Sequence, residues 1–195
     1  MRITDFIIND IKPIEEAKNI GEVQTIFSQT TYSHMPIAKD GVYVGSLAEN
    51  DAHCYDADCP IIDYKHAFEQ FFVRFETNWL DVLEAFAQNS TNIMPVLSES
   101  GAYLGYYELA DVMNFFNATP FISEAGSVVV IEKGALDYSF SEISQIIESN
   151  EGKLLGAFIS KIENDVVEIS VKIGRANFND ILVLSWEHPV KLLCS

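Results

Sequence analysis

One stretch of the chain occurs twice, and this repeat constrains the fold more than any single residue does. Residues 34–51 return as residues 93–111, with one extra residue before the second turn. The matched positions are Pro36 and Pro95, Gly41 and Gly101, Gly45 and Gly105, and Asp51 and Asp111. The likeness extends upstream, because residues 23–27 and 82–86 lead into the Met-Pro step at equal spacing. A duplicated unit of this kind predicts two half-modules that bury their faces against each other.

Each copy is expected to fold as a helix, a buried strand, a tight polar turn, a second strand and another helix. Apolar residues at spacings of three and four predict amphipathic helices over residues 20–28 and 79–86. Gly41 and Gly101 each end a polar turn, and the residues that follow them have the pattern of hairpin strands. A helix over residues 109–116 closes the second copy.

The stretch between the two copies, residues 53–75, has no counterpart elsewhere in the chain. Its phenylalanines predict a helix packed against the repeats, because aromatic residues at this spacing belong to a core more often than to a binding surface. They are Phe68, Phe71, Phe72 and Phe75. The same stretch gathers His53, Cys54 and Cys59 near two carboxylates, and zinc accepts all these ligand types. The Cys-x4-Cys spacing is loose and no second Cys or His pair follows it, so a surface loop is favoured over a metal site.

The pattern changes after a linker at residues 118–126, which combines a proline, small residues and a glycine. The elements expected beyond it are a strand, a helix, a two-stranded hairpin, a helix and a strand, at residues 127–132, 142–150, 154–162, 166–173, 178–186 and 190–193. This βαββαβ order is the split arrangement of ferredoxin-like folds. The sequence therefore predicts two domains, residues 1–120, with repeats at about 1–60 and 61–120, and residues 121–195.

Composition excludes several classes of protein. With 195 residues, of which 48% are hydrophobic and 21% charged, the chain can bury a sizeable core. Its 12 basic and 29 acidic residues give a net charge of −17, without the basic footprint that nucleic acid requires. The sequence has neither a secretory signal pattern nor the roughly eighteen unbroken apolar residues of a membrane span. Its three cysteines make no disulfide framework. We therefore expect a cytoplasmic protein that binds neither nucleic acid nor membranes.

Motifs of catalysis are missing from the sequence. The four histidines, His34, His53, His66 and His188, stand in no recognised nucleophile–base arrangement. There is no G-x-S-x-G, no Walker loop and no G-x-G-x-x-G. We expect a protein that is not an enzyme and that has neither a catalytic residue nor a resident cofactor.

The two matched motifs resemble a tandem pair of CBS domains over about residues 1–118. The part from Ser127 onward resembles an ACT domain through its order of elements, with Asp137 near the position of an effector-binding Asp. Together the two parts are similar to small bacterial CBS–ACT proteins, including those of the acetoin-utilisation type. The resemblance implies a mixed α+β or α/β fold, with a pseudo-twofold pair of βαββα repeats and a ferredoxin-like, ACT-like βαββαβ domain. It also implies two clefts that take adenosine compounds such as AMP, ADP, ATP or S-adenosylmethionine.

The resemblance assigns ligand contacts to particular residues. The adenine wall would be made by the residues around the two Met-Pro steps, Met35, Pro36, Ile37, Met94, Pro95 and Val96, and the ribose acceptors would be Asp51 and Asp111. The family's phosphate-binding hydroxyl is replaced by Ala48 and by Glu108, and Ser46 lies two positions too early to substitute. Two unit charges about 4 Å apart repel by about 4 kcal/mol at an effective dielectric constant of about 20. A neutral adenosine or a cationic S-adenosylmethionine therefore suits Glu108 better than a phosphate.

These observations leave three hypotheses about function, of which the third is a metal-dependent activity around His53, Cys54 and Cys59. The first is a non-catalytic regulatory homodimer that senses an adenosine compound in the clefts of the pair. The second is a structural or scaffold dimer whose clefts are degenerate and which acts through an unknown protein partner. In this second case Asp51 and Asp111 only cap the helices that follow them.

Overall fold

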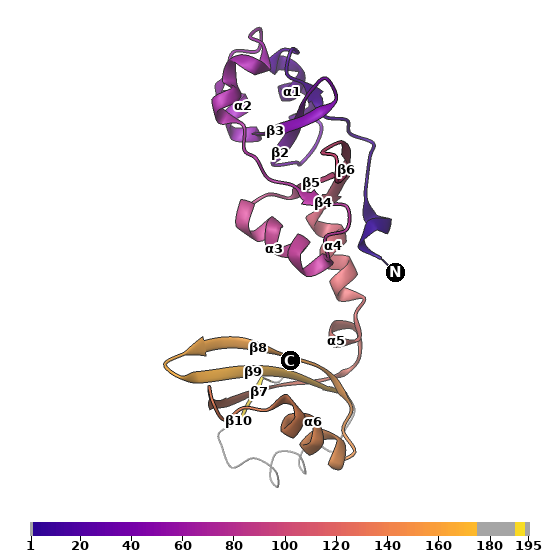
Figure 1. Cartoon of the computed structure of the whole chain (residues 1–195), viewed down its shortest axis with the longest axis vertical. Coiled ribbons are helices and arrows are strands. Elements are labelled where there is room, and N and C mark those ends of the chain that lie inside the picture. The colour runs from indigo at the N-terminus through magenta and orange to yellow at the C-terminus, as the bar shows by residue number, and fades with distance from the viewer. Residues whose placement is uncertain (1, 175–189, 194–195) are drawn as a thin grey trace. The chain divides into compact units, whose positions relative to one another are not determined.

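The computed structural model describes residues 2–174 and 190–193, and the chain divides into two compact units, Met1–Phe115 and Phe116–Ser195 (Figure 1). The predicted helix at residues 178–186 lies outside the described residues. Among the described residues, no helix combines the length and the apolar character needed to cross a bilayer.

The N-terminal unit contains the two repeats, and each has the same five elements. The first repeat comprises β1 (Ile14–Glu15), α1 (Ile20–Phe27), β2 (His34–Lys39), β3 (Val42–Ala48) and α2 (Glu49–Cys54). The second comprises β4 (Val73–Arg74), α3 (Trp79–Asn89), β5 (Ile93–Leu97), β6 (Tyr103–Glu108) and α4 (Leu109–Asn117). Both sheets have three strands, in the orders β1-β2-β3 and β4-β5-β6, with one parallel and one antiparallel pair each. The predicted helix–strand–turn–strand–helix order is confirmed in both copies, and the short first strands were missed.

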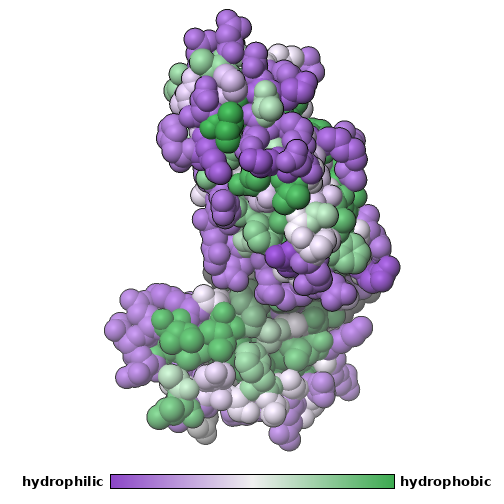
Figure 2. Space-filling view, turned by 45° about the horizontal axis from the view of Figure 1, so that its top comes forward, coloured by the Kyte–Doolittle hydropathy of each residue, from purple (hydrophilic) through white to green (hydrophobic). Residues whose placement is uncertain are grey.

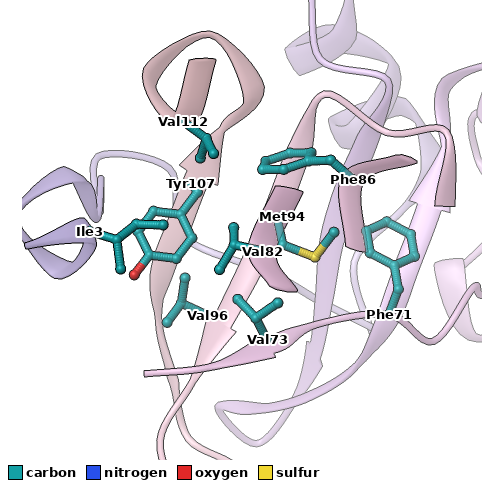
Figure 3. Packing of buried hydrophobic residues seen from close by; sticks show 9 residues of the cluster. All are labelled: Ile3, Phe71, Val73, Val82, Phe86, Met94, Val96, Tyr107 and Val112. Atoms are coloured by element: carbon teal, nitrogen blue, oxygen red, sulfur yellow. The ribbon is translucent and has the colours of Figure 1, made fainter. Parts of the chain in front are cut away.

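Each repeat buries a hydrophobic cluster of its own between its helices and its sheet. The first cluster centres on Val23, Phe27, Met35, Ile37 and Leu47. The second contains Ile3, Phe71, Val73, Val82, Phe86, Met94, Val96, Tyr107 and Val112 (Figure 3). The helices α1 and α3 present apolar residues at spacings of three and four, so one face of each helix is buried against its sheet. The repeat is thus preserved in packing as well as in sequence.

Two backbone crossings tie the repeats to each other. The segment that precedes the first repeat pairs with the second, because Ile8 and Tyr106 exchange two backbone hydrogen bonds of 2.9 Å. The segment that precedes the second repeat pairs with the first, because Glu69 and Ser46 exchange two of 2.8 Å. Beside these crossings, Gly105 and Gly45 have φ values of +149° and +148°, and a Cβ at either position would meet the crossing chain. Only glycine fits such a conformation at such a close approach.

The expected helix around the four phenylalanines between the repeats is wrong. A 3-10 helix, η2 (Ile61–Ala67), ends before them, and the chain then runs without helix to β4. Its backbone groups are engaged by the first repeat, through Glu69 and through the Phe71 carbonyl, which accepts a 2.8 Å bond from the Tyr43 hydroxyl. The phenylalanines accordingly separate: Phe68 packs on the first cluster and Phe71 enters the second, while Phe72 and Phe75 remain exposed. A crossing segment has to serve two cores, and a helix would present all four rings to one side.

The C-terminal unit is a four-stranded antiparallel sheet with a helix on one face. Its elements are α5 (Pro120–Ser123), β7 (Gly126–Gly134), α6 (Phe140–Ser149), β8 (Leu154–Glu163), β9 (Val166–Gly174) and β10 (Val190–Leu193). The strand order β10-β7-β9-β8, with every neighbouring pair antiparallel, is that of the split arrangement predicted from the sequence. Figure 1 shows α6 beside this sheet. Ile143 and Ile147 of α6 pack on buried valines and isoleucines of β7 and β9. The predicted linker contains α5, a short helix that the sequence did not indicate.

Candidate functional site

The pseudo-twofold relation between the repeats is marked by a pair of reciprocal hydrogen bonds. Ser33 and Asn92 occupy matched positions, each just before the buried strand of its repeat. The Ser33 amide donates to Asn92 Oδ1 at 2.8 Å, and the Asn92 amide donates to Ser33 Oγ at 3.1 Å. Their carbonyls accept from the first residues of the helices that follow, Glu49 and Leu109. This exchange joins the loop after α1 to the loop after α3.

A pocket of about 410 Å³ opens beside this junction, within the N-terminal unit. One wall comes from the loop after α1, and the other from the second repeat, where β6 passes into α4. The lining residues are Gln29, Thr30, Thr31, Tyr32, Asn92, Glu108 and Ala110. Asn92 is held rigidly, since its side-chain amide also donates to the Thr31 carbonyl at 2.7 Å. Because both repeats contribute to its wall, the pocket exists only when they are assembled.

A chain of hydroxyls and carboxylates runs from the pocket wall to the N-terminal segment. The Tyr32 hydroxyl donates to Glu108 Oε1 at 2.6 Å and lies 2.9 Å from the Tyr106 hydroxyl. The Tyr106 hydroxyl in turn donates to Asp10 Oδ1 at 2.7 Å. The two rings meet edge to face, with centroids 5.6 Å apart. Four side chains from three separate segments are therefore linked by short polar contacts.

The electrostatics of this chain follow from burial and from its hydrogen bonds. Burial, reinforced by the bond to Glu108, raises the pKa of the Tyr32 hydroxyl. Burial also raises the pKa of Tyr106, and its bonds to Tyr32 and Asp10 act in the same direction. The bond that Tyr106 donates lowers the pKa of Asp10 below its ordinary value. Both tyrosines are therefore neutral donors near neutral pH, facing acceptors.

The pocket favours a ligand that offers donors or positive charge. Glu108 is the one charged side chain among the lining residues, and the others are neutral. A phosphate about 4 Å from the Glu108 carboxylate would meet a repulsion of about 4 kcal/mol at an effective dielectric constant of about 20. A hydroxyl or a cation at the same place would find a partner.

The residues predicted to bind adenosine occupy three kinds of position. Glu108 lines the pocket, and the neighbouring Asp111 is half-buried in the first turn of α4. Asp51 holds the matched position in α2. The six residues of the predicted adenine wall are all buried in β2 and β5: Met35, Pro36, Ile37, Met94, Pro95 and Val96. Four of these side chains, Met35, Ile37, Met94 and Val96, belong to the two cores.

Tyr32, Tyr106 and Asp10 were missed by the sequence analysis. Their signal was available in the aligned repeats: Tyr32 is matched by Thr91, and Tyr106 by Ser46. A large aromatic residue in one copy opposite a small hydroxyl in the other indicates a place where the copies have diverged. Asp10 gave no such signal, because the backbone crossing at Ile8 brings it to the second repeat.

The candidate zinc residues have other surroundings. His53 lies in α2, where its Nε2 atom is 3.8 Å from Glu49 Oε1, and Cys54 is exposed beside it. Cys59 belongs to the loop after α2, and its backbone bonds to Asp56 and Ile20. Within residues 2–174 and 190–193, no group of three or more His, Cys, Asp or Glu side chains is arranged to hold a metal ion.

The C-terminal unit has a pocket of its own, of about 360 Å³, where β7 leads toward α6. It is lined by Gly134, Ala135, Leu136, Asp137 and Asp165. Backbone bonds from Ala135 to Asp165 and from Asp137 to Gly134 close the loop. Asp137, which the sequence placed near an effector position, is exposed at this pocket.

Comparison with solved structures identifies the architecture of the repeats. A CBS domain pair/ACT domain protein from Thermotoga maritima aligns with a TM-score of 0.54 at 20% identity, over 60% of this chain and 96% of that one. CBS domains of a transcriptional regulator from Streptococcus pneumoniae align with a TM-score of 0.52 at 18% identity, over 58% of this chain and 98% of that one. The repeats have the fold of a CBS domain pair.

A third solved structure is the cytosolic domain of the Mg²⁺ channel MgtE in complex with ATP. It aligns with a TM-score of 0.50 at 18% identity, over 56% of this chain and 46% of that one. No protein-family profile matches the chain, and no curated protein matches it. At these identities the comparisons give the fold of the CBS pair, and the ligand has to be argued from the residues of this chain.

Proposed function

We propose that this protein is a non-catalytic regulator whose CBS pair senses an adenosine compound in the pocket at Glu108. The observation that carries the proposal is the pocket itself, since residues of both repeats close it around one carboxylate. A ligand held there contacts both repeats and stabilises their assembly. The MgtE structure, in which a domain of the same fold was solved with ATP, supports nucleotides as the class to test.

The expected ligand is adenosine or S-adenosylmethionine rather than AMP or ATP. Glu108 accepts hydrogen bonds from ribose or amino groups and attracts a sulfonium, and it repels phosphates. Asp111, half-buried in the first turn of α4, is the proposed ribose acceptor, with Asp51 as its counterpart in the first repeat. The main-chain atoms around Pro36 and Pro95 are the proposed adenine contacts, because the flanking side chains are buried in the cores.

A thermal-shift series with adenosine, S-adenosylmethionine, AMP and ATP tests this function. A ligand that binds only the folded state raises its stability by about 2.7 kcal/mol at 100 times Kd. We expect the shift in Tm to fall from adenosine and S-adenosylmethionine to AMP and then to ATP. No shift with any of the four would favour a scaffold acting through a protein partner. Tight ATP binding would show that another residue supplies phosphate contacts.

We further propose that residues 121–195 form an ACT-like domain through which the protein associates as a homodimer. The antiparallel strand order supports this assignment, and so does an apolar surface on the C-terminal unit (Figure 2). The large hydrophobic residues exposed in the described part of this unit are Ile122, Leu136, Phe140, Phe158, Ile162 and Val166. Twofold dimers are the commonest closed assembly. Light scattering should give twice the 21.9 kDa chain mass, and a monomer would contradict the proposal.

The boundary between the two domains is tested separately. We expect limited proteolysis to cut first near Thr119 to Gly126, because most residues of this stretch are exposed. First cuts inside the CBS pair or inside the sheet would place the boundary elsewhere.

A further inference from the structure

The N-terminal segment, residues 2–12, precedes the first repeat but is anchored beside the pocket of the second. It begins with a 3-10 helix, η1 (Ile3–Phe6), and crosses the edge of β6 at Ile8. Ile3 is buried in the second cluster, and Phe6 and Ile7 pack against it. Figure 1 shows the N-terminal segment running alongside the second repeat.

The N-terminal segment is held by polar contacts at Asp10 and by apolar contacts at Ile3. The polar contacts are continuous with the pocket wall. Asp10 accepts from Tyr106, and Tyr106 lies 2.9 Å from Tyr32, whose hydroxyl donates to Glu108 inside the pocket. Tyr32 comes from the loop after α1 in the first repeat, and these contacts join its side chain to the second repeat. The four side chains therefore form the Glu108–Asp10 chain, which joins the pocket to the N-terminal segment.

The apolar contacts at Ile3 leave one polar atom unsatisfied. The Tyr107 hydroxyl is buried beside Ile3 without a hydrogen-bond partner in the described part of the chain (Figure 3). A buried hydroxyl left unpaired costs free energy, so the packing around Ile3 is less favourable than that in the rest of the cluster. The segment is held by the backbone crossing at Ile8, by the polar contacts of Asp10 and by the less favourable packing of Ile3. It is therefore easier to release than a strand of either sheet.

We propose that occupancy of the pocket is transmitted to the N-terminal segment through Tyr32, Tyr106 and Asp10. A ligand donor that binds the Glu108 carboxylate competes with the Tyr32 hydroxyl. Once Tyr32 is displaced, Tyr106 loses both the 2.9 Å contact of its hydroxyl and the edge-to-face contact of its ring. Tyr106 is then positioned less firmly against Asp10, so the segment opens more often. This inference rests on the proposed function for its natural trigger, and the coupling itself is measurable without a ligand. By linkage, a looser segment changes ligand affinity by the same factor.

Hydrogen exchange of the full chain, followed by mass spectrometry, tests the coupling. In Tyr32→Phe we expect amides of residues 2–12, Ile8 above all, to exchange about tenfold faster, since two short polar contacts are lost. Tyr43→Phe is the matched control: Tyr43 also makes two hydrogen bonds, to Ser46 and Phe71, but none to the segment. Unchanged exchange at Ile8 in Tyr32→Phe would overturn the proposal, as would an equal effect in Tyr43→Phe.

The ligand arm uses adenosine and S-adenosylmethionine as probes. A bound probe should accelerate exchange at Ile8 in the wild type and have no such effect in Tyr32→Phe. Asp10→Ala should bind the probe about fivefold more tightly, as reciprocal coupling requires. A probe that binds and leaves Ile8 unchanged overturns the proposal. If neither probe binds, the proposed function fails, and the Tyr32→Phe arm still decides whether the pocket wall and the segment are coupled.

Discussion

The two repeats of the CBS pair share their strand register and their buried clusters, yet they differ where they face each other. In the first repeat, the Tyr43 hydroxyl binds Ser46 Oγ and the Phe71 carbonyl. In the second, Ser46 is replaced by Tyr106, whose hydroxyl turns to Tyr32 and Asp10 and leaves the buried Tyr103 hydroxyl without a partner in the described residues. Duplication kept the apolar positions, which are constrained by packing, while the polar positions at the junction diverged. Two residues that differ between the copies, Tyr32 and Glu108, line the pocket.

The largest expected effects test whether the two cores are equivalent. Phe27 and Phe86 occupy matched helix positions and are buried to 3% and 2% exposure. Phe27→Ala and Phe86→Ala should each lower the free energy of unfolding by about 3–5 kcal/mol, because each leaves a cavity in a closed cluster. Chemical denaturation of both variants measures this. A clear difference between them would show that the repeats pack unequally.

Substitution of the glycines at the two crossings should lower the free energy of unfolding by different amounts in the two repeats. A Cβ at Gly105 would overlap the Ile8 carbonyl, whereas at Gly45 it would lie 2.9 Å from the Phe68 Cβ atom. Gly105→Ala should cost about 3 kcal/mol and Gly45→Ala about 1–2 kcal/mol, because the overlap with the Ile8 carbonyl oxygen at Gly105 is the more severe of the two. Denaturation midpoints rank the two. The reverse order would contradict the tighter crossing at Ile8.

Restoring a hydroxyl at the diverged position should change ligand preference in one repeat. Glu108→Thr removes a repulsive charge and adds a donor, so AMP binding should improve by about 1–3 kcal/mol. Ala48→Thr is the matched control in the first repeat, and it should leave AMP binding at the Glu108 pocket unchanged. Calorimetry with AMP and adenosine measures the affinity of each variant for the two ligands. Equal gains in both variants would indicate a second working cleft.

The two hairpin tyrosines offer a smaller test of the same asymmetry. Burial raises the pKa of Tyr43 to about 12, and that of Tyr103 is raised as well, so both hydroxyls keep their protons. Tyr43→Phe should cost about 1 kcal/mol in unfolding free energy, since two hydrogen bonds are lost. Tyr103→Phe should be neutral or stabilising, because its hydroxyl is unpaired. A loss at Tyr103 as large as that at Tyr43 would reveal a partner for it.

The smallest expected effect concerns acid. The hydrogen bond from Tyr106 lowers the pKa of Asp10 in the folded state below 3.8. A carboxyl with a lowered folded pKa contributes stability above its unfolded pKa, and that contribution is lost as pH falls through the folded value. At neutral pH the urea midpoint of Asp10→Asn should therefore differ fully from that of the wild type. At low pH the difference between the two midpoints should become smaller. Urea midpoints at the two pH values measure it. A gap that widens on acidification would contradict the sign.

Local patterns explain which parts of the fold could be predicted. Helix spacing in α1 and α3, the glycine turns, and the Asn164-Asp165 turn between β8 and β9 all act within a few residues, so periodicity and turn chemistry located them. Pattern alone misled at Phe68 and Phe71. Both residues fit one helical face, but they are drawn into different cores by the crossing at Glu69.

The sequence by itself determined the duplication, the order of helices and strands in the two repeats, and the positions where the copies differ, such as Ala48 and Glu108. These properties are carried by residue identity and short-range spacing. Only the tertiary structure decided that Tyr32 from one repeat meets Glu108 of the other, and that Asp10 meets Tyr106, which lies 96 residues further along the chain. Such contacts depend on backbone crossings between residues far apart in the chain, which no local period encodes.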